Sequence, residues 1–345
     1  MDFTAREAPS VAAAIEAGNV PALQRGSYDL RVDRELERRA WQKTIDGRPP
    51  RIDVAQRSAN PLDVADLTPS PGASPIAVVI PVRDRAGQRL RNTLRSLQWQ
   101  SAGAPAEVVV VSHGSRPEID RELETLCGDE GARLISLSRP SEPWNKCVAL
   151  NTGIRRSPAA ADFLMTMDAD IVLAPDFLLV VIERLRQHPP ALVLCRISDL
   201  PAQACLPSDR DALLHAFDRL RPSTSLRSRC GSGGIQAAAR AFFFAIRGYD
   251  EDLAWWGAMD GDILNRARLM GLELDWIEHR TAMLHQWHPR KHAALSRPEQ
   301  ISAAKQAWRA NHALVRARRY LLQRNLRAWG GEVDDSAVAV RGGAG

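Results

Sequence analysis

The stretch Phe163-Leu-Met-Thr-Met-Asp-Ala-Asp-Ile-Val-Leu-Ala-Pro175 joins a short apolar run to two closely spaced carboxylates. Its first half is typical of a strand that is buried on both faces of a sheet. Asp168 and Asp170 follow the run, and alternate residues of an extended chain point the same way. Both carboxylates can therefore face one point just beyond the strand end.

Two anions held this close repel each other, and a divalent cation between or beside them would relieve the repulsion. Oxygen ligands suit Mn²⁺ or Mg²⁺, and these cations in turn suit phosphate oxygens. An ordinary strand-to-loop turn, in which Asp168 and Asp170 cap a following helix, is the alternative interpretation of the same residues.

Short β-branched runs alternate with helical patterns ahead of this stretch. Strands are predicted over Ile76–Ile80, closed by Pro81, over Glu107–Val111 and over Ala132–Leu137. Helices are expected over residues 90–97, 119–126 and 146–154. This alternation predicts an α/β fold with a mostly parallel, Rossmann-like sheet that helices flank on both faces.

Ligands of such sheets bind at the carboxyl ends of the strands. The groups expected at those ends are Arg83, Asp84, Arg85, Ser112, His113, Asp168 and Asp170. Two arginines and two carboxylates at one edge of a sheet indicate a site for a nucleotide diphosphate.

The composition of the 345-residue chain is that of a globular protein, with 45% hydrophobic and 25% charged residues. The net charge is only +5 and the arginines are scattered among acids, so no nucleic-acid partner is expected. No run approaches the roughly 20 apolar residues of a membrane span, and the N-terminus lacks a signal-peptide pattern. The five cysteines are widely spaced, which favours reduced thiols and a cytoplasmic location.

Proline and glycine divide the chain into an N-terminal part, a central domain and a C-terminal part. For residues 1–73 the sequence predicts a helical extension and a linker, to which no motif assigns a function. Residues 74–295 predict the domain, with a nucleotide-binding half (74–175) and an acceptor half (176–295). A helical segment is expected over 296–335, and a disordered tail over 336–345.

The acceptor half predicts helices over 177–187 and 212–220 and strands over 191–197 and 273–277. Between them, Cys230-Gly-Ser-Gly-Gly-Ile-Gln236 lacks the spacing of a phosphate-binding loop. Its glycines either let the backbone approach a bulky ligand or form a bulge, and both interpretations remain open.

The segment from Gly248 to Arg266 pairs tryptophans with glycine and then places acids at the start of a helix. It contains Trp255, Trp256, Gly257, Asp260 and Asp262. One interpretation is a tryptophan-rich corner of the core in which Asp260 caps the helix. The other is an aromatic platform for a sugar ring, with a nearby carboxylate that accepts a hydroxyl proton.

Histidines cluster in Leu284-His-Gln-Trp-His-Pro-Arg-Lys-His292. Three histidines in so few residues is a density typical of metal ligands, although histidines on a surface loop are also common. The Arg-rich helical pattern over residues 297–328 favours a solvated packing helix.

Taken together, these motifs resemble the GT-A fold glycosyltransferases of family 2 and the related animal β-galactosyltransferases and chondroitin-type polymerases. The motif Ile80-Pro-Val-Arg-Asp-Arg85 resembles the first-strand motif that contacts the nucleotide. The segment Pro143–Gly153 resembles the one that precedes the metal motif, and Asp168-Ala-Asp170 matches the DxD motif. The segment Gly248–Asp262 resembles the acceptor motif that carries the catalytic base.

The resemblance implies a metal-dependent transferase that moves a sugar from a nucleotide-diphosphate sugar, with UDP favoured, to a hydroxyl of a glycan or other acceptor. It further implies inversion at the anomeric carbon and Asp260 as the catalytic base. Asp170 and His288 would hold Mn²⁺ or Mg²⁺, assisted by His285 and Asp168. The implied donor-binding residues are Pro81, Arg83, Arg85, Ser112, Lys146 and Asp168; the implied acceptor-binding residues are Trp255, Trp256, Gly257 and Asp262.

The sequence departs from the family pattern at two places. Ser112-His-Gly-Ser115 stands where the family usually carries Asp residues that hold the base and ribose, and Met259 replaces an acid before the expected base. Two other functions remain open: a sugar-phosphate nucleotidyltransferase, which would normally show a glycine-rich first loop, and a non-catalytic glycan-binding protein on a transferase fold.

Overall fold

The structure is a computed structural model that describes the chain from residue 75 to residue 341 with gaps. The described residues are 75–137, 144–188, 190–204, 206–228, 233–253, 255, 257–288, 298–325, 329–330 and 338–341. The N-terminal extension predicted over residues 1–73 therefore lies outside the described residues, as does Trp256.

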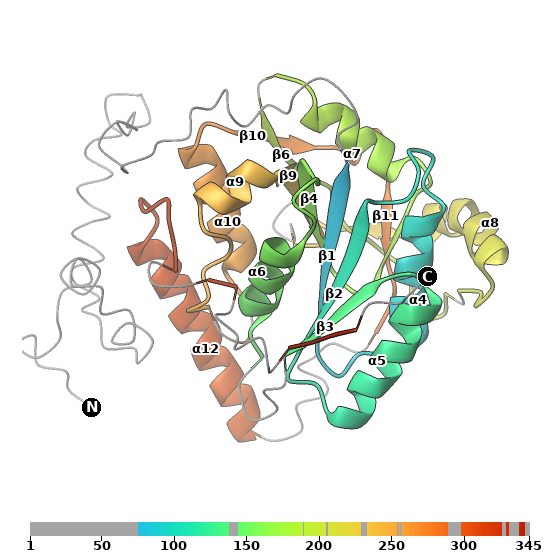
Figure 1. The fold of residues 1–345 in the computed structure, drawn as a ribbon, viewed down its shortest axis with the longest axis horizontal. Coiled ribbons are helices and arrows are strands. Elements are labelled where there is room, and N and C mark those ends of the chain that lie inside the picture. The colour runs from blue at the N-terminus through green and yellow to red at the C-terminus, as the bar shows by residue number, and fades with distance from the viewer. Residues whose placement is uncertain are drawn as a thin grey trace, which may run out of the picture.

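A large mixed sheet forms the centre of the molecule, in the strand order β10-β6-β9-β4-β1-β2-β3-β12 (Figure 1). Its strands are β1 (Ile76–Val82), β2 (Glu107–His113), β3 (Arg133–Leu137), β4 (Phe163–Met167), β6 (Ala191–Leu194), β9 (Ile235–Ala239), β10 (Glu273–Trp276) and β12 (Val338–Arg341). Strands β3, β2, β1 and β4 pair in parallel, while β9 pairs antiparallel with both β4 and β6. The predicted α/β class with a mostly parallel sheet is confirmed.

A second, smaller sheet continues the chain where the central strand ends. It has the order β5-β11-β7-β8, with β5 (Ile171–Leu173), β11 (Met283–His285), β7 (Ser198–Asp199) and β8 (Ser225–Leu226). Strand β5 begins directly after the turn that follows β4, and it pairs antiparallel with β11. This pairing brings residues near 170 and near 285 together.

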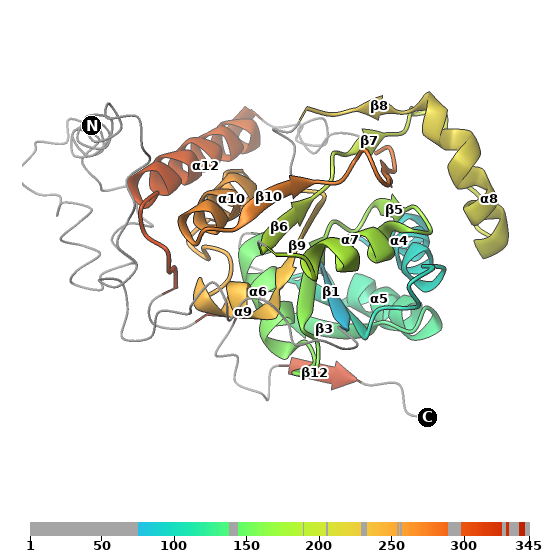
Figure 2. The ribbon, with the colours of Figure 1, turned by 90° about the horizontal axis from the view of Figure 1, so that it is seen from above.

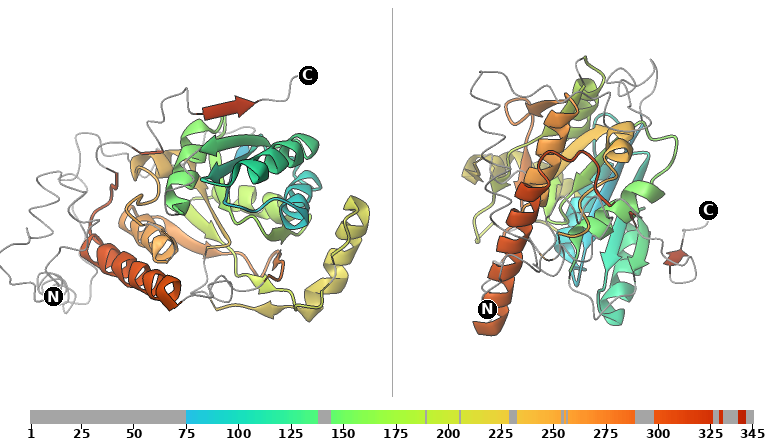
Figure 3. Two further views of the ribbon diagram at one scale, coloured as in Figure 1. Left: turned by 90° about the horizontal axis from the view of Figure 1, so that it is seen from below. Right: turned by 90° about the vertical axis from the view of Figure 1, so that its left-hand side faces the viewer.

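Helices cover both faces of the large sheet, and each face has its own apolar cluster. One cluster holds residues of α4 (Gln88–Gln98), α5 (Pro117–Asp129) and α7 (Phe177–Leu185). The other holds residues of α6 (Lys146–Arg156), α9 (Arg240–Ala245), α10 (Met259–Leu269) and α12 (Pro298–Ala317). The helices α10 and α12 lie side by side, and α8 (Arg210–Leu220) lies beside the small sheet at the periphery (Figures 2 and 3).

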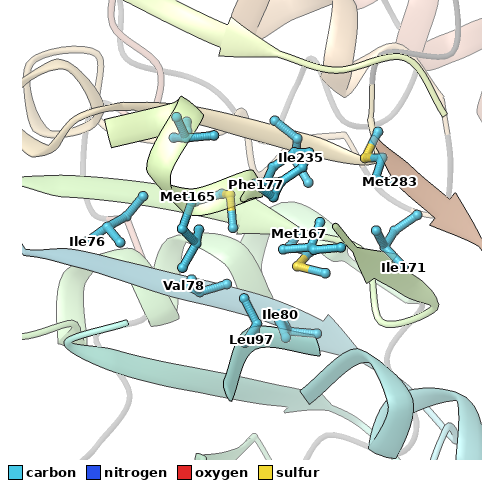
Figure 4. Packing of buried hydrophobic residues seen from close by; sticks show 14 of the residues in the cluster. Ile76, Val78, Ile80, Leu97, Met165, Met167, Ile171, Phe177, Ile235 and Met283 are labelled. Carbon is cyan, nitrogen blue, oxygen red and sulfur yellow. The ribbon is translucent and has the colours of Figure 1, made fainter. Parts of the chain in front are cut away.

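The alternation of side chains along β1 explains why one strand feeds both clusters. Val78 and Ile80 point into the cluster shared with Met165 and Phe177, as Figure 4 shows. Ala77 and Val79 belong to the cluster on the opposite face. A strand that is apolar at every position is therefore required here, which is why the continuous apolar runs predict the sheet well.

Several elements differ from the sequence prediction. Strand β9 is alanine-rich, with Ile235 as its only β-branched residue, and no strand is predicted there from the sequence. The glycine-rich stretch 230–236, interpreted as a loop or bulge, overlaps only its first two residues. The expected disordered tail over 336–345 includes β12, which pairs antiparallel with β3. Among the described residues, no helix is both long enough and apolar enough to cross a membrane.

Candidate active site

The turn over residues 168–170 lies at the carboxyl end of β4, near the middle of the large sheet. Two hydrogen bonds hold the backbone carbonyls of this turn. The Thr93 side chain donates through Oγ1 to the Ala169 carbonyl at 3.1 Å, and the Gln286 backbone N–H donates to the Asp170 carbonyl at 2.9 Å. The turn is therefore fixed from α4 and from the segment after β11.

Asp170, His285 and His288 form a group whose potential ligand atoms all lie within 4.8 Å of one another. The Asp170 carboxylate lies 3.2 Å from His288 Nε2 and 3.7 Å from His285 Nε2. All three side chains are largely buried, with 8, 17 and 13% exposed for Asp170, His288 and His285. The sequence-predicted ligands Asp170, His285 and His288 are thus brought together.

The charges around Asp170 favour its ionised form. Burial alone would raise its pKa, but a hydrogen bond from His288 and the neighbouring His285 and Arg85 side chains hold the pKa well below its usual range. Arg85 Nη1 donates to Asp170 Oδ2 at 2.7 Å. Burial lowers the pKa of His285, although Asp170 opposes that shift, which favours the neutral ring that a metal ligand requires.

Asp168 has a different partner from Asp170. Its Oδ1 accepts a hydrogen bond at 2.6 Å from Nζ of Lys146, the first residue of α6. Residues 168–170 form a turn and not an extended strand, so the two carboxylates do not share one direction as the sequence predicted. Asp168 therefore lies outside the three-residue group, and its assisting role toward a metal stays a prediction.

Asp260 is half-buried at the second position of α10. Ala258 precedes the helix and supplies no side-chain hydrogen bond to it, so the interpretation of Asp260 as the cap does not hold. A Cβ atom at Gly233 would lie 2.5 Å from Asp260 Oδ2, so any larger residue there would displace this carboxylate. Burial raises the pKa of Asp260; Lys146 opposes the shift and Asp168 adds to it.

The segment before α10 has an unusual backbone. Trp255, Gly257 and Ala258 all have positive φ, at 65, 101 and 70°. The Trp255 side chain is 46% exposed. A Cβ at Gly257 would lie 2.5 Å from Cδ1 of Trp308, a residue of α12 that no sequence motif marks. Exposed Trp255 is consistent with the predicted acceptor contact, which stays a prediction.

Asp262 is a correction to the predicted acceptor residues. Its side chain is 1% exposed, and it accepts hydrogen bonds from Arg266 Nε at 2.9 Å and from Arg324 Nη2 at 2.7 Å. Both arginines are themselves buried. Asp262 lies two residues after Asp260 in α10, and residues two apart in a helix point in different directions. Asp262 therefore belongs to a buried ion network and not to the acceptor surface.

The ends of β1 and β2 form the other side of the site. Pro81 is buried and Arg83 is half-buried. Ser112 Oγ donates to Asp120 Oδ1 at 2.6 Å, and Asp120 lies on α5. A small polar cavity of about 60 Å³ lies between the loop after β1 and Asp170.

Two residues near the site escaped sequence reasoning. Asp199 and Arg227 lie next to His285, with Asp199 on the two-residue strand β7 and Arg227 just after β8. Elements this short show no periodicity, so no pattern in the sequence could have marked them.

Comparison with known proteins identifies a family. The model of the family described as Glycosyl transferase family 2 matches residues 77–253, about half of the chain. The matched residues include Asp168 and Asp170, while Asp260, His285 and His288 follow them. A probable N-acetylgalactosaminyltransferase 9 of Caenorhabditis elegans is 37% identical over 59 residues, which is 17% of this chain and 10% of that protein.

Solved glycosyltransferase structures are similar at low sequence identity. Staphylococcus aureus TarS 1-349 in complex with UDP-GlcNAc has a TM-score of 0.46 at 14% identity, covering 67% of this chain and 64% of that one. GalNAc-T7 with UDP, GalNAc and Mn²⁺ has a TM-score of 0.48 at 18% identity, covering 64 and 45%. The mannosyltransferase PcManGT of Pyrobaculum calidifontis, with GDP-Man and Mn²⁺, has a TM-score of 0.45 at 19% identity, covering 84 and 80%.

Proposed function

The chain belongs to glycosyl transferase family 2, and on this premise we propose that it moves a sugar from a nucleotide-diphosphate sugar to an acceptor hydroxyl with the help of a divalent cation. The observation that carries the proposal is the grouping of Asp170, His285 and His288 within 4.8 Å, at the strand end where nucleotide ligands of α/β sheets bind. Family membership argues against the nucleotidyltransferase alternative.

One carboxylate and two imidazoles are a donor set that fits a divalent transition metal. Imidazole ligands favour Mn²⁺ over Mg²⁺, which prefers oxygen ligands, so Mn²⁺ is the first choice. Asp170, His285 and His288 would hold the cation. When bound, it would neutralise the negative charge that develops on the leaving diphosphate.

The donor would lie between the ends of β1, β2 and β4. Arg83 and Arg85 follow β1 and would contact the phosphates, because guanidinium groups match phosphate geometry. Arg85 already reaches Asp170 at 2.7 Å, so it stands beside the proposed cation ligands. Lys146 and Asp168, paired at 2.6 Å, and Ser112 complete the proposed donor side.

Asp260 would act as the general base. Its raised pKa suits a group that must accept a proton, and Lys146 limits the rise by favouring the ionised carboxylate. The acceptor oxygen would attack the anomeric carbon from the face opposite the diphosphate, its proton would pass to the Asp260 carboxylate, and the configuration would invert. Trp255 and Gly257 would contact the acceptor.

The test combines a donor panel with the substitution Asp260→Asn. Wild-type protein with Mn²⁺, a panel of UDP- and GDP-sugars and mixed acceptor glycans should release free nucleoside diphosphate. An N-acetylgalactosamine donor comes first in the panel because of the 59-residue match. Asp260→Asn should keep nucleotide affinity by calorimetry and lose about 10²–10⁴-fold in turnover.

Asp209→Asn is the matched control, since Asp209 is also an acid at the start of a helix but caps α8 through the Ala212 N–H at 2.8 Å. It should leave turnover unchanged. Full activity of Asp260→Asn would remove Asp260 as the base. Donor binding without any nucleotide release in the wild type would favour the glycan-binding alternative.

A further inference from the structure

His285 has a second carboxylate partner besides Asp170. Its Nδ1 lies 2.8 Å from Oδ1 of Asp199, while its Nε2 faces Asp170 Oδ1 at 3.7 Å. Nδ1 also lies 3.2 Å from Nη2 of Arg227. The two ring nitrogens of His285 therefore face two different acids on opposite sides of the ring.

Asp199 is itself held in place by Arg227. Arg227 Nε donates to Asp199 Oδ2 at 2.5 Å, and Arg227 Nη2 donates to Asp199 Oδ1 at 2.6 Å, as in a two-point guanidinium–carboxylate pair. The backbone of Arg227 is tied to the Ile197 carbonyl at 2.8 Å. The carboxylate that faces His285 is thus fixed from two directions.

The small sheet sets this arrangement through strand register. Asp199 on β7 is the direct pairing partner of His285 on β11, and of Ser225 on β8. Directly paired residues of neighbouring strands place their side chains on the same face of a sheet. Asp199 therefore meets His285 because of backbone pairing and not through a chance surface contact.

We propose that Asp199 is a positioning residue for the cation site, and that it orients His285 and fixes the proton on Nδ1. Asp199 and Arg227 compete for Nδ1: the carboxylate oxygen at 2.8 Å only accepts and favours a proton there, whereas the guanidinium Nη2 at 3.2 Å only donates and favours a lone pair. We assign the proton to Nδ1 because two acceptors at the shorter distance of 2.8 Å would repel each other. Nε2 then carries the lone pair, directed toward Asp170 and His288. The inference rests on the proposed function, because the ion that Nε2 would bind is the cation of that proposal.

Partners of this kind fix the tautomer and the ring orientation of metal-binding histidines, and their loss typically weakens metal affinity by 10–100-fold. Without Asp199, Nδ1 would be left near the Arg227 guanidinium. Arg227 can only donate, so it would favour a proton on Nε2 and block the ligand lone pair. The wrong tautomer is therefore the expected state of Asp199→Ala.

Two readouts on the full chain test the proposal. The first is the ¹⁵N signature of the His285 ring, assigned with His285→Gln and measured without metal. Wild type should show the Nδ1–H tautomer, and Asp199→Ala should shift toward Nε2–H. The second is the Mn²⁺ dissociation constant, measured by loss of the free-ion electron paramagnetic resonance signal with UDP present. It should rise 10–100-fold in Asp199→Ala and less in Asp199→Asn, which keeps an acceptor oxygen.

Asp275→Ala is the matched control. Asp275 pairs with Arg184 at 2.5 Å and is 31% exposed, against 33% for Asp199, but it lies on β10 of the large sheet. Its loss should cost similar stability and leave the Mn²⁺ constant unchanged. An Nε2–H tautomer in the wild type, or equal Mn²⁺ constants for wild type and Asp199→Ala, would overturn the proposal.

The two proposals fail in different ways. If the wild type binds no Mn²⁺, the metal part of the proposed function fails and the role of Asp199 toward a cation fails with it. If the wild type binds Mn²⁺ and releases nucleotide while the ring keeps its tautomer in Asp199→Ala, only the role of Asp199 is wrong.

Discussion

Lys146 is the residue that links the two halves of the site. It contacts Asp168 at 2.6 Å and interacts electrostatically with Asp260. Burial alone would lower the pKa of Lys146, but Asp168 and Asp260 raise it above its ordinary value. The amine therefore stays charged, and this one cation stabilises a carboxylate proposed for the donor side and another proposed as the base.

Removal of this charge should change the pH dependence of turnover. The base works in its ionised form, so kcat should rise with pH as Asp260 loses its proton. Lys146 lowers the pKa of Asp260, so Lys146→Met should raise it and move the acid limb of the kcat profile to higher pH. Measurement at saturating donor separates this effect from weaker binding.

Lys146→Arg keeps the charge and serves as the control, with its acid limb close to that of the wild type. An acid limb that stays in place or moves to lower pH in Lys146→Met would contradict the proposed coupling between Lys146 and Asp260.

At the scale of elements, the position of Lys146 depends on how closely α6 approaches the sheet. Gly153 faces β1, and a Cβ atom there would lie 2.3 Å from Cγ1 of Val79 and 3.1 Å from Cγ2 of Val111. Both valines are fully buried, so neither can move into open space. The absence of a side chain at Gly153 lets α6 lie flat on the sheet with Lys146 at its start.

Gly153→Ala should destabilise the protein by about 1–3 kcal/mol, the usual cost of overpacking a filled core. Gly128→Ala in α5 is the matched control, because a Cβ there would meet nothing within 4 Å. It should be neutral or stabilising, since alanine has the higher helix propensity. Urea denaturation measures both, and equal stability of the two variants would refute the packing argument.

The sequence predicted the elements and site residues that a local pattern marks. It did not predict strand pairings or side-chain contacts between residues that lie far apart in the chain. The apolar run of β4 and the carboxylates after it could be predicted, because strand burial and local spacing are visible in the sequence. The pairing of β11 with β5 could not, because three-residue strands have no periodicity. Asp262 was given an acceptor role by the family resemblance, and no local pattern marks its burial or its pairing with Arg324, 62 residues away.

At the scale of the whole molecule, a buried ion network joins the acceptor segment to the C-terminal part of the chain. Arg324 donates a hydrogen bond to Asp262 at 2.7 Å and forms an ion pair with Asp250 at 3.1 Å, and Arg318 donates to Asp250 at 2.8 Å. Burial would raise the pKa of Asp250, but Arg318 and Arg324 lower it below its ordinary value. The network therefore fixes α10, and with it Asp260, against the residues that follow α12.

Arg324→Gln should cost about 3–5 kcal/mol at neutral pH, because it leaves two buried carboxylates short of a cation. Arg280→Gln is the control: its pair with Glu183 is solvent-exposed, and its loss should cost less than about 1 kcal/mol. Because the folded-state pKa of Asp250 lies below its unfolded value, the network's contribution is complete at neutral pH and is lost as the pH falls below about 4. Equal unfolding free energies for both variants would contradict this role.

Strand β9 is synthesised long after β4, the strand with which it pairs in the large sheet. Thr166 of β4 pairs with Gln236 of β9, 70 residues later, so β4 leaves the ribosome with one apolar edge open. The imidazoles of His285 and His288 emerge later still. A fragment that stops at residue 253, where the family match ends, would carry Asp168 and Asp170 but neither histidine. Fragments chosen for expression should therefore extend past Arg324. A fragment that ends between Asp262 and Arg324 would leave the buried carboxylates of Asp250 and Asp262 without Arg324, the partner they share.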